Sequence, residues 1–426
     1  MAPSLRRALC GAPFWPFHHT LWLRPSARSA GVRIGALKML SLPTELWLLI
    51  GADLSDRDLL AAIQVNRTFH SQLIRLFYRN FVICGAHGRS SRPLLRRSTK
   101  SSKRRVPPIY VKRSFAAIER LKRIQSSSML MGAIKSCTLC HFSDPVDETE
   151  KIIADALEQV LQEGVAFIST LPHCREIVID AVLMNNHQLK QLISPHSQLA
   201  DLSVQDLTVS DGDSTFPSGS QHRCPLKNLT ISGLRGSQQS VREFAEWSMS
   251  GDLRSLSVQN GIEDHLSVFH TQVLQRSFPN LRRLEFNPST ISAQVLECLP
   301  MLEELIFHHP SPPLVLTPTI LPRLQTFQGP GAQARSIIPG RPIRALHIVI
   351  DFKGLLPSRM RDVAPNFGSA TPILELSVER GTPKGVIRQG RITRICPSLQ
   401  ILRLYLASTV KMDAVRVNGT SCQEES

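Results

Sequence analysis

The sequence predicts an α/β protein in which a small N-terminal helical module precedes an irregular arc of short parallel strands with helices outside. A stretch near the N-terminus has apolar residues at helical spacing. Farther along, one apolar pattern of strand type recurs many times. The chain has 426 residues, of which 42% are hydrophobic and 20% charged, so it is long enough and apolar enough to bury a sizeable core.

The net charge of +16 is concentrated in two segments. Residues 1–38 contain six Lys and Arg and no acidic residue, and residues 89–123 contain thirteen Lys and Arg but only one Glu. The rest of the chain is therefore close to neutral. Because aromatic residues for base stacking are nearly absent from the basic runs, we expect no nucleic-acid partner. No apolar run reaches the roughly 18 residues of a membrane span, so we expect no membrane partner either.

The basic segments also suggest where the folded parts begin and end. Residues 1–38 are interrupted by prolines, and we favour an untranslated or dispensable leader before Met39 over a mitochondrial targeting sequence or a disordered tail. We expect residues 84–130 to be a basic linker, helical at most near residues 114–124. Nuclear import or contact with an acidic partner is the alternative to a solvated insertion there. Residues 407–426 are expected to form a C-terminal tail.

Residues 39–83 are expected to form the helical module. Pro43 suits the first turn of a helix, where its missing N–H costs nothing, and Ser55 is a good cap for a second helix. Three amphipathic helices are predicted from the spacing of Leu46, Leu49, Ile50, Leu59, Leu60, Ile63, Val65, Phe69, Leu73, Leu76 and Phe77. A unit this small buries little apolar surface, so it is expected to dock onto something larger.

These residues resemble an F-box. The resemblance rests on the run Leu42-Pro43-x-Glu45-Leu46, then Ile50, Leu54, Asp58-Leu59 and Val65-Asn66-Arg67-x-Phe69, and it covers about 40 of the 426 residues. One departure is Gly51-Ala52-Asp53, where the family more often has a bulky residue, and we expect weaker packing there. The alternative is an unrelated pair of amphipathic helices.

The resemblance implies that the module binds the Skp-type adaptor of a Skp–cullin–F-box ubiquitin ligase, and through it a cullin. Apolar side chains of the motif would form the contact surface. The residues expected to bind the adaptor are Leu42, Pro43, Leu46, Ile50, Leu54, Leu59 and Val65.

A repeat extends over residues 131–406. The pattern Leu-x-x-Leu-x-Leu, with other apolar residues or Cys as substitutes, begins at Ile134, Cys174, Leu199, Leu226, Leu253, Leu281, Leu302, Leu324, Ile343, Ile373 and Leu399. The nine steps from Cys174 to Leu399 have a mean period of 25 residues, within the range of leucine-rich repeats. Because the unit length varies, we expect an irregular arc. A generic α/β protein with chance spacing is the alternative.

Between the strands, apolar spacing predicts helices over residues 148–162, 241–249, 269–277 and 292–298. The sequence Gly329-Pro330-Gly331 imitates a dinucleotide-binding fingerprint, which must open a helix. Since Pro339 and Pro342 would break such a helix, we expect an inter-repeat loop and no cofactor at this point.

The segment Cys137-Thr138-Leu139-Cys140-His141 has the spacing of a haem attachment site. It overlaps the strand pattern of the first unit, so core or edge cysteines are the preferred interpretation. As a zinc half-site it would need a second pair, for which Cys174 and His173 are the nearest candidates. The nine cysteines are spread along the chain, which favours reduced thiols in the cytoplasm or nucleus. We expect no metal, no cofactor and no catalytic residue.

An F-box followed by such repeats resembles the fungal and animal F-box/leucine-rich-repeat proteins. The resemblance implies a substrate receptor that is not itself an enzyme and that marks its target for proteasomal degradation. The third and fifth positions of each unit point away from the apolar ladder, onto the concave face. The central residues expected to bind the unknown protein target are Arg283, Glu285, Glu304 and Ile306. A ligase-independent repeat scaffold, or a mitochondrial or nucleic-acid-associated factor, are the competing interpretations.

Overall fold

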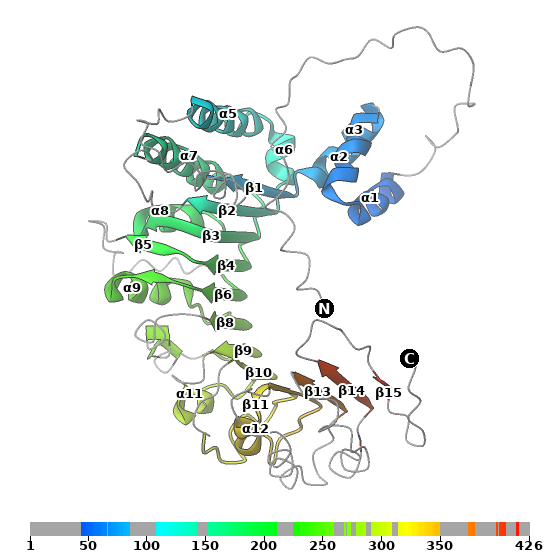
Figure 1. Ribbon diagram of the computed structural model, residues 1–426, viewed down its shortest axis with the longest axis vertical. Helices are drawn as coiled ribbons and strands as arrows, with labels where there is room; N and C mark the ends of the chain where they lie inside the picture. Colours follow the sequence, from blue (N-terminus) through cyan, green and yellow to red (C-terminus); the bar gives the residue numbers. More distant parts are fainter. Residues whose placement is uncertain are drawn as a thin grey trace, which may run out of the picture.

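The computed structural model is an α/β structure with one large, mainly parallel sheet, so the coarse fold class is confirmed (Figure 1). None of the described helices has the length and apolar character needed to cross a membrane. The structure describes residues 44–65, 67–85, 108–142, 151–210, 225–259, 268–269, 271–273, 278–286, 291–308, 314–349, 374–379, 398, 400–405 and 415–416.

The helical module consists of α1 (Thr44–Asp53), α2 (Asp56–Val65) and α3 (Arg67–Phe77). Its core is formed by Leu59, Ile63 and Leu73. The Ser55 hydroxyl accepts a hydrogen bond from the backbone N–H of Asp58 at 3.2 Å, which confirms the predicted cap of α2.

Gly51 brings α1 close to α3. A Cβ atom at this position would lie 2.8 Å from Cδ1 of Leu76 and 2.9 Å from Cδ2 of Leu73, closer than carbon atoms normally approach. On the same side of α1, the ring of Trp47 packs edge-on against Phe69 with a centroid distance of 4.5 Å. The small residue that departs from the F-box pattern therefore allows tight helix packing, and the expectation of weak packing there is wrong.

The sheet follows the chain from one edge to the other, and neighbouring strands are parallel as far as β14. Only the last pair, β14 with β15, is antiparallel. Two short strands, β5 and β7, form a side ladder with the end of β3. The strands are β1 (Asn80–Cys84), β2 (Ser136–Phe142), β3 (Glu176–Asn185), β4 (Asp201–Gln205), β5 (Thr208–Ser210), β6 (Asn228–Ser232), β7 (Arg235–Gly236), β8 (Ser255–Gln259), β9 (Arg283–Phe286), β10 (Glu304–Phe307), β11 (Thr326–Pro330), β12 (Ala345–Val349), β13 (Glu375–Glu379), β14 (Ile401–Tyr405) and β15 (Val415–Arg416).

The fourth position of each sequence repeat occupies the same place in the sheet. These residues lie opposite one another in one continuous row: Cys137, Ile177, Leu202, Leu229, Leu256, Leu284, Leu305, Phe327, Leu346, Leu376 and Leu402. From Cys137 to Leu346 every member of the row is at most 1% exposed. The apolar spacing therefore located these strands and their register correctly.

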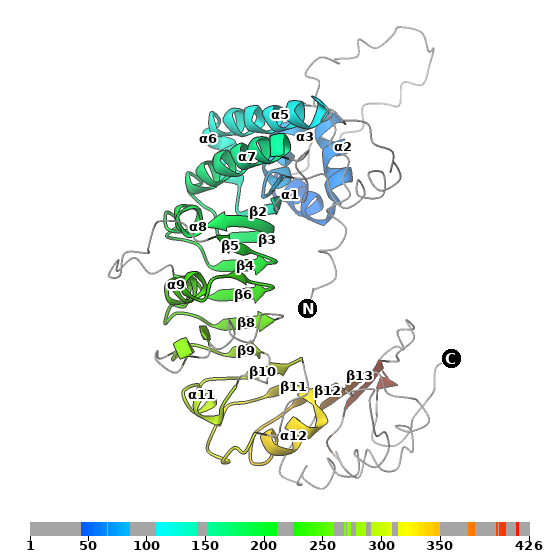
Figure 2. The same cartoon turned by 60° about the vertical axis from the view of Figure 1, so that its left-hand side comes forward.

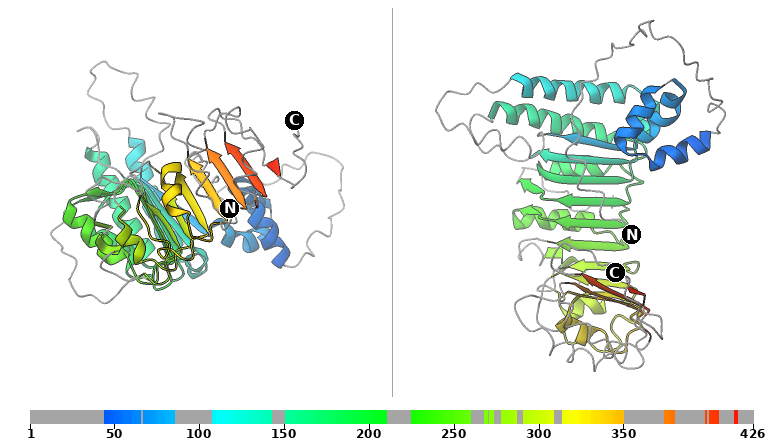
Figure 3. Two further views of the ribbon diagram at one scale, coloured as in Figure 1. Left: turned by 90° about the horizontal axis from the view of Figure 1, so that it is seen from below. Right: turned by 45° about the vertical axis from the view of Figure 1, so that its right-hand side comes forward.

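Helices cover the side of the sheet that carries this row, and their apolar residues join the same core. The helices are α5 (Pro108–Gln125), α6 (Ser128–Ala133), α7 (Lys151–Ser169), α8 (Asn186–Ile193), α9 (Gln238–Ser248), α11 (Ala293–Glu297) and α12 (Gly331–Ile337). The sheet bends so that the helical module and the last strands project toward the same side (Figure 2). We call it the open side, because among the described helices α5 to α12 cover the opposite side. Seen from below, α5 to α9 lie along one side of the stacked strands, and the helical module lies on the other (Figure 3).

Two predicted boundaries are wrong. Residues 80–84 form β1, the first strand of the sheet, so the sheet begins within the predicted helical module. Within the predicted linker 84–130, α5 packs into the main core through Ile118, Leu121 and Ile124. Arg120, Lys122 and Arg123 lie on the exposed side of α5, so the helix is amphipathic despite its charge. The predicted leader (1–38) and tail (407–426) lie almost entirely outside the described residues.

The helix predictions are largely confirmed, with one correction. The segments 148–162, 241–249 and 292–298 overlap α7, α9 and α11, and the described residues between 269 and 277 are helical. The predicted loop after Gly329 is instead the end of β11 followed by α12. Pro339 and Pro342 follow this helix, so they limit its length and do not prevent it.

Candidate protein-docking surfaces

The helical module exposes several large apolar side chains. Leu46, Leu49 and Ile50 lie on one face of α1 and are 43%, 64% and 45% exposed, and Val65 at the end of α2 is 68% exposed. Grouped exposed apolar side chains are typical of a surface that another protein covers. Leu49 was not among the predicted adaptor-binding residues, although its position three residues after Leu46 places it on the same face. We call Leu46, Leu49 and Ile50 the α1 face.

The other predicted adaptor-binding residues are placed differently. Leu54 is partly buried against the core of the module. Leu59 is 4% exposed and belongs to that core, so the prediction that it contacts a partner is corrected: it supports the helices from inside. Leu42 and Pro43 lie outside the described residues.

The four predicted target-binding residues come together on neighbouring strands. Arg283 lies opposite Glu304, and Glu285 lies opposite Ile306, in the pairing of β9 with β10. Because side chains alternate along a strand, all four lie on the side of the sheet opposite the buried row. This is the open side, toward which the helical module projects in Figure 2.

A network of polar side chains surrounds Glu285. Its carboxylate accepts hydrogen bonds from Gln259 and His308, and it lies 3.4 Å from the guanidinium of Arg283. The same guanidinium forms an ion pair with Glu304 at 3.3 Å. Arg283 therefore joins two acidic residues from adjacent strands. Burial alone would raise the pKa of Glu285, but the hydrogen bond and charge of His308 and the charge of Arg283 outweigh it, so this pKa is lowered.

Two of the four predicted target-binding residues are exposed to solvent, and two are buried. The side chains of Arg283 and Glu304 are 45% and 32% exposed and remain available to a partner. Glu285 is 8% exposed and Ile306 only 4%, so the prediction that these two contact a target is corrected. Glu285 instead holds its neighbours in place. His308, exposed at the end of β10, was not predicted and joins the accessible group through its contact with Glu285.

The cysteines of the predicted motif point to different faces of β2. Cys137 lies in the buried row, where the side chains of Cys137 and Cys174 are hydrogen-bonded. That hydrogen bond and burial raise the pKa of the Cys137 thiol well above its ordinary value, which makes it unreactive. Cys140 faces the other side of the sheet, so Cys137 and Cys140 do not act together. A scan of protein-family models and a search of the curated proteins found no match to this chain.

Proposed function

We propose that this chain is the substrate-recognition subunit of a Skp–cullin–F-box ubiquitin ligase. In this role the helical module is an F-box, and the sheet with its outer helices is an irregular leucine-rich-repeat solenoid that binds a protein target. The chain itself performs no bond chemistry and works in the cytoplasm or nucleus. The observation that carries the proposal is the exposed α1 face, within a sequence that resembles an F-box.

The α1 face supports the adaptor-binding role in energetic terms. Fully burying a Leu or Ile side chain contributes about 1.5–3 kcal/mol. Each residue of this face has about half of that surface still to bury, so together they supply a few kcal/mol on contact with a partner. Val65 adds a further exposed apolar side chain. The module's own core residues, Leu59, Ile63 and Leu73, keep the three helices in place for that contact.

The sheet supports the target-binding role. Its buried row recurs with the period of leucine-rich repeats, and its helices lie on the side of that row. The opposite side is not covered by α5 to α12 and carries the accessible residues Arg283, Glu304 and His308. Both charge signs are present there, which suits a protein surface better than a phosphate backbone.

Co-purification with a recombinant Skp-type adaptor tests the proposal. The full chain is compared with a Leu46→Ala, Leu49→Ala, Ile50→Ala variant, and with Val315→Ala as a control. Val315 is 91% exposed and belongs to the loop before β11, so its truncation removes apolar surface without touching the module.

We expect the wild type and the control to retain the adaptor and a cullin, and the triple variant to lose both. A wild-type chain that retains no adaptor would contradict the proposal and favour the ligase-independent scaffold. Equal retention by the triple variant would show that the α1 face is not the docking surface.

A further inference from the structure

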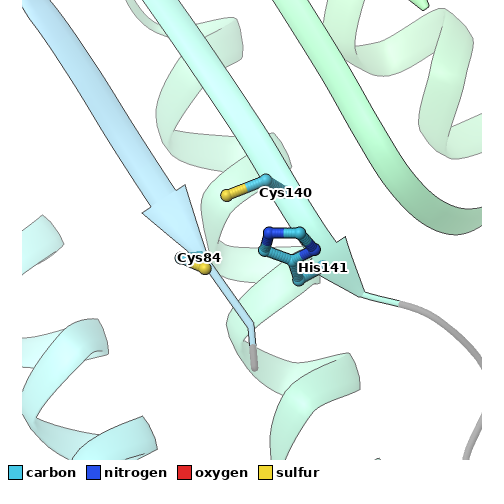
Figure 4. Close-up of side chains that lie close together, drawn as sticks. All are labelled: Cys84, Cys140 and His141. Atoms are coloured by element: carbon cyan, nitrogen blue, oxygen red, sulfur yellow. The ribbon is translucent and has the colours of Figure 1, made fainter. Parts of the chain in front are cut away.

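Three chemistry-bearing side chains meet where β1 and β2 end. They are Cys84, the last residue of β1, and Cys140 and His141 near the end of β2. Their sulfur and ring-nitrogen atoms all lie within 4.8 Å of one another (Figure 4). More than fifty residues of sequence separate the first from the other two, so only strand pairing brings them together.

The parallel pairing of β1 with β2 places Cys84 opposite Cys140. Both residues follow a core residue, Ile83 and Leu139 respectively, so both face the open side of the sheet. At the next position the backbone N–H of Gly85 donates a hydrogen bond to the Cys140 carbonyl at 2.9 Å, which holds the two strand ends together. The two thiols are therefore positioned by the backbone of the sheet.

His141 joins them because of a local backbone conformation. In a regular strand it would point to the opposite face from Cys140, but its φ is +60°, in the left-handed region. The equivalent positions of the next three units also have positive φ, at Ala181, Asp206 and Gly233. The left-handed turn is thus a general feature of these units, whereas the imidazole is particular to this one.

The surroundings differ from those of a core cysteine pair. Cys137 and Cys174 are 0% and 1% exposed and belong to the main core. Cys84 and His141 are partly exposed, and only Cys140 is buried. Asp180 lies opposite Cys140 on β3 and continues the same row, so a carboxylate stands beside the thiols. Two thiols and an imidazole that are partly exposed and lie next to a carboxylate can bind a metal cation.

The geometry fits a tetrahedral metal ion. Zinc bonds of about 2.3 Å to sulfur and 2.0–2.1 Å to nitrogen place ligand atoms roughly 3.5–3.8 Å apart. The observed separations are all within 4.8 Å, so they exceed that range by about 1 Å at most. Two sulfur ligands and one nitrogen ligand form a donor set that zinc accepts, with a fourth position left for water.

We propose that Cys84, Cys140 and His141 bind one Zn²⁺ ion. The ion joins the end of β1 to the end of β2. Because β1 is the edge strand that follows α3 directly, the ion fixes the strand through which the helical module is connected to the sheet. The proposal is independent of ubiquitin ligation and goes beyond that function. It also replaces the zinc half-site considered from sequence, since the second group is Cys84 and not Cys174 or His173.

Titration of the metal-free full chain with Co²⁺ tests the site, because cobalt replaces zinc and reports its ligands by absorption. We expect one equivalent to give thiolate-to-cobalt charge-transfer absorption and the visible bands of tetrahedral cobalt, and Zn²⁺ to displace both signals. A Cys84→Ser, Cys140→Ser variant should lose these signals. Cys298→Ser, which removes an exposed thiol elsewhere, should keep them.

A second variant keeps the test decisive if the double substitution disturbs the fold. His141→Asn retains a residue that tolerates positive φ but removes the imidazole, and we expect it to bind Zn²⁺ at least tenfold more weakly. Zn²⁺ should also raise the thermal midpoint of the wild type by a few degrees and leave that of the double variant unchanged. Wild-type protein without the cobalt signals, or equal signals and Zn²⁺ affinity in the wild type and His141→Asn, would overturn the proposal.

Discussion

Arg341 shows how one buried side chain organises the chain between two strands. It is 2% exposed, and its guanidinium donates hydrogen bonds of 2.7 Å to the carbonyls of Ile320 and Thr317. It also donates to the carbonyls of Pro339, at 3.2 Å, and Ile337. Thr317 and Ile320 lie before β11, Ile337 ends α12 and Pro339 follows it, so a single residue fixes the loop before β11 and the end of α12. Burial lowers the pKa of Arg341, but an arginine stays charged at neutral pH.

We predict that Arg341→Ala destabilises the protein by about 2–4 kcal/mol, because it leaves several buried carbonyls without a donor. Arg341→Lys should recover only part of the loss, since an ammonium group lacks the planar fork that reaches four acceptors. Chemical denaturation followed by circular dichroism measures both. Arg344→Ala is the control, because Arg344 is exposed and three residues away. Equal stability of Arg341→Ala and Arg344→Ala would contradict this role.

The lowered pKa of Glu285 predicts that the stability of the protein depends on pH. Its pKa is lower in the folded state than in the unfolded chain, so the ionised carboxylate stabilises the fold. That contribution is complete above the ordinary glutamate pKa of about 4.3 and is lost as the pH falls through the lowered value. We expect Glu285→Gln to cost about 1–3 kcal/mol at pH 7 and progressively less below about pH 4. Denaturation at several pH values measures this, with Glu297→Gln, on the exposed side of α11, as a control. A difference that grows on acidification would contradict the sign.

At the scale of elements, the contact of α1 with α3 depends on the size of residue 51. The closest contacts of a Cβ atom there are the flexible ends of Leu73 and Leu76, and alanine gains about 1 kcal/mol of helix propensity. Gly51→Ala should therefore be close to neutral. Gly51→Leu should destabilise the module by about 1–3 kcal/mol through overpacking and weaken adaptor binding with it.

Gly132→Ala in α6 is the matched control, because a Cβ atom added at this glycine would meet no other atom within 4 Å. It should be neutral or stabilising. Thermal denaturation followed by circular dichroism ranks the three variants. Gly51→Leu with wild-type stability would show that the two helices are not packed as described.

The elements that the sequence predicted have an apolar spacing that recurs along the chain, whereas the elements that it missed do not. The strands of the buried row repeat one spacing many times, so each unit supports the others. β1 has the same alternation, with Phe81 and Ile83 buried, but it is short and follows a helix without a break in composition. In α5 the buried face of Ile118, Leu121 and Ile124 was hidden by basic residues on the exposed face. Neither the apolar pattern of β1 nor that of α5 can be recognised before the sheet against which they pack is known.

The residues of the candidate surfaces were also predicted only in part. Helical spacing placed Leu46 and Ile50 on an exposed face, but it did not show that Leu59 would turn into the core of α2 and α3. Strand alternation placed Glu285 and Ile306 on the correct side of the sheet, but burial by neighbouring strands is invisible in a single unit. The meeting of Cys84 with Cys140 depends on strand pairing across a long sequence gap.

At the scale of the whole molecule, target capture should depend on the surface charges of β9 and β10. Exchanging charges by Arg283→Glu with Glu304→Arg keeps an ion pair between the strands but inverts the pattern that a partner meets. It also removes the ion pair of Arg283 with Glu285, so adaptor binding serves as the check that the variant is folded. We expect loss of the captured proteins without loss of adaptor binding. Mass spectrometry of proteins that co-purify with each variant measures this.

The control exchanges Arg282 and Glu303 in the same way, since they form a 3.1 Å ion pair one residue earlier on the same two chain segments. It should leave capture unchanged, because Arg282 and Glu303 precede β9 and β10 and are not among the strand positions of the proposed target surface. An unchanged set of captured proteins after the Arg283 and Glu304 exchange would show that targets bind elsewhere.

The central claim is that the helical module binds a Skp-type adaptor through the α1 face, and calorimetric titration of the full chain with the purified adaptor tests it most directly. We expect a one-to-one complex with a Kd below about 1 μM, which corresponds to about −8 kcal/mol. The Leu46→Ala, Leu49→Ala, Ile50→Ala variant should bind at least about 30-fold more weakly while keeping its helical content. Absence of binding by the wild-type chain, or equal affinity of the folded variant, would contradict the account.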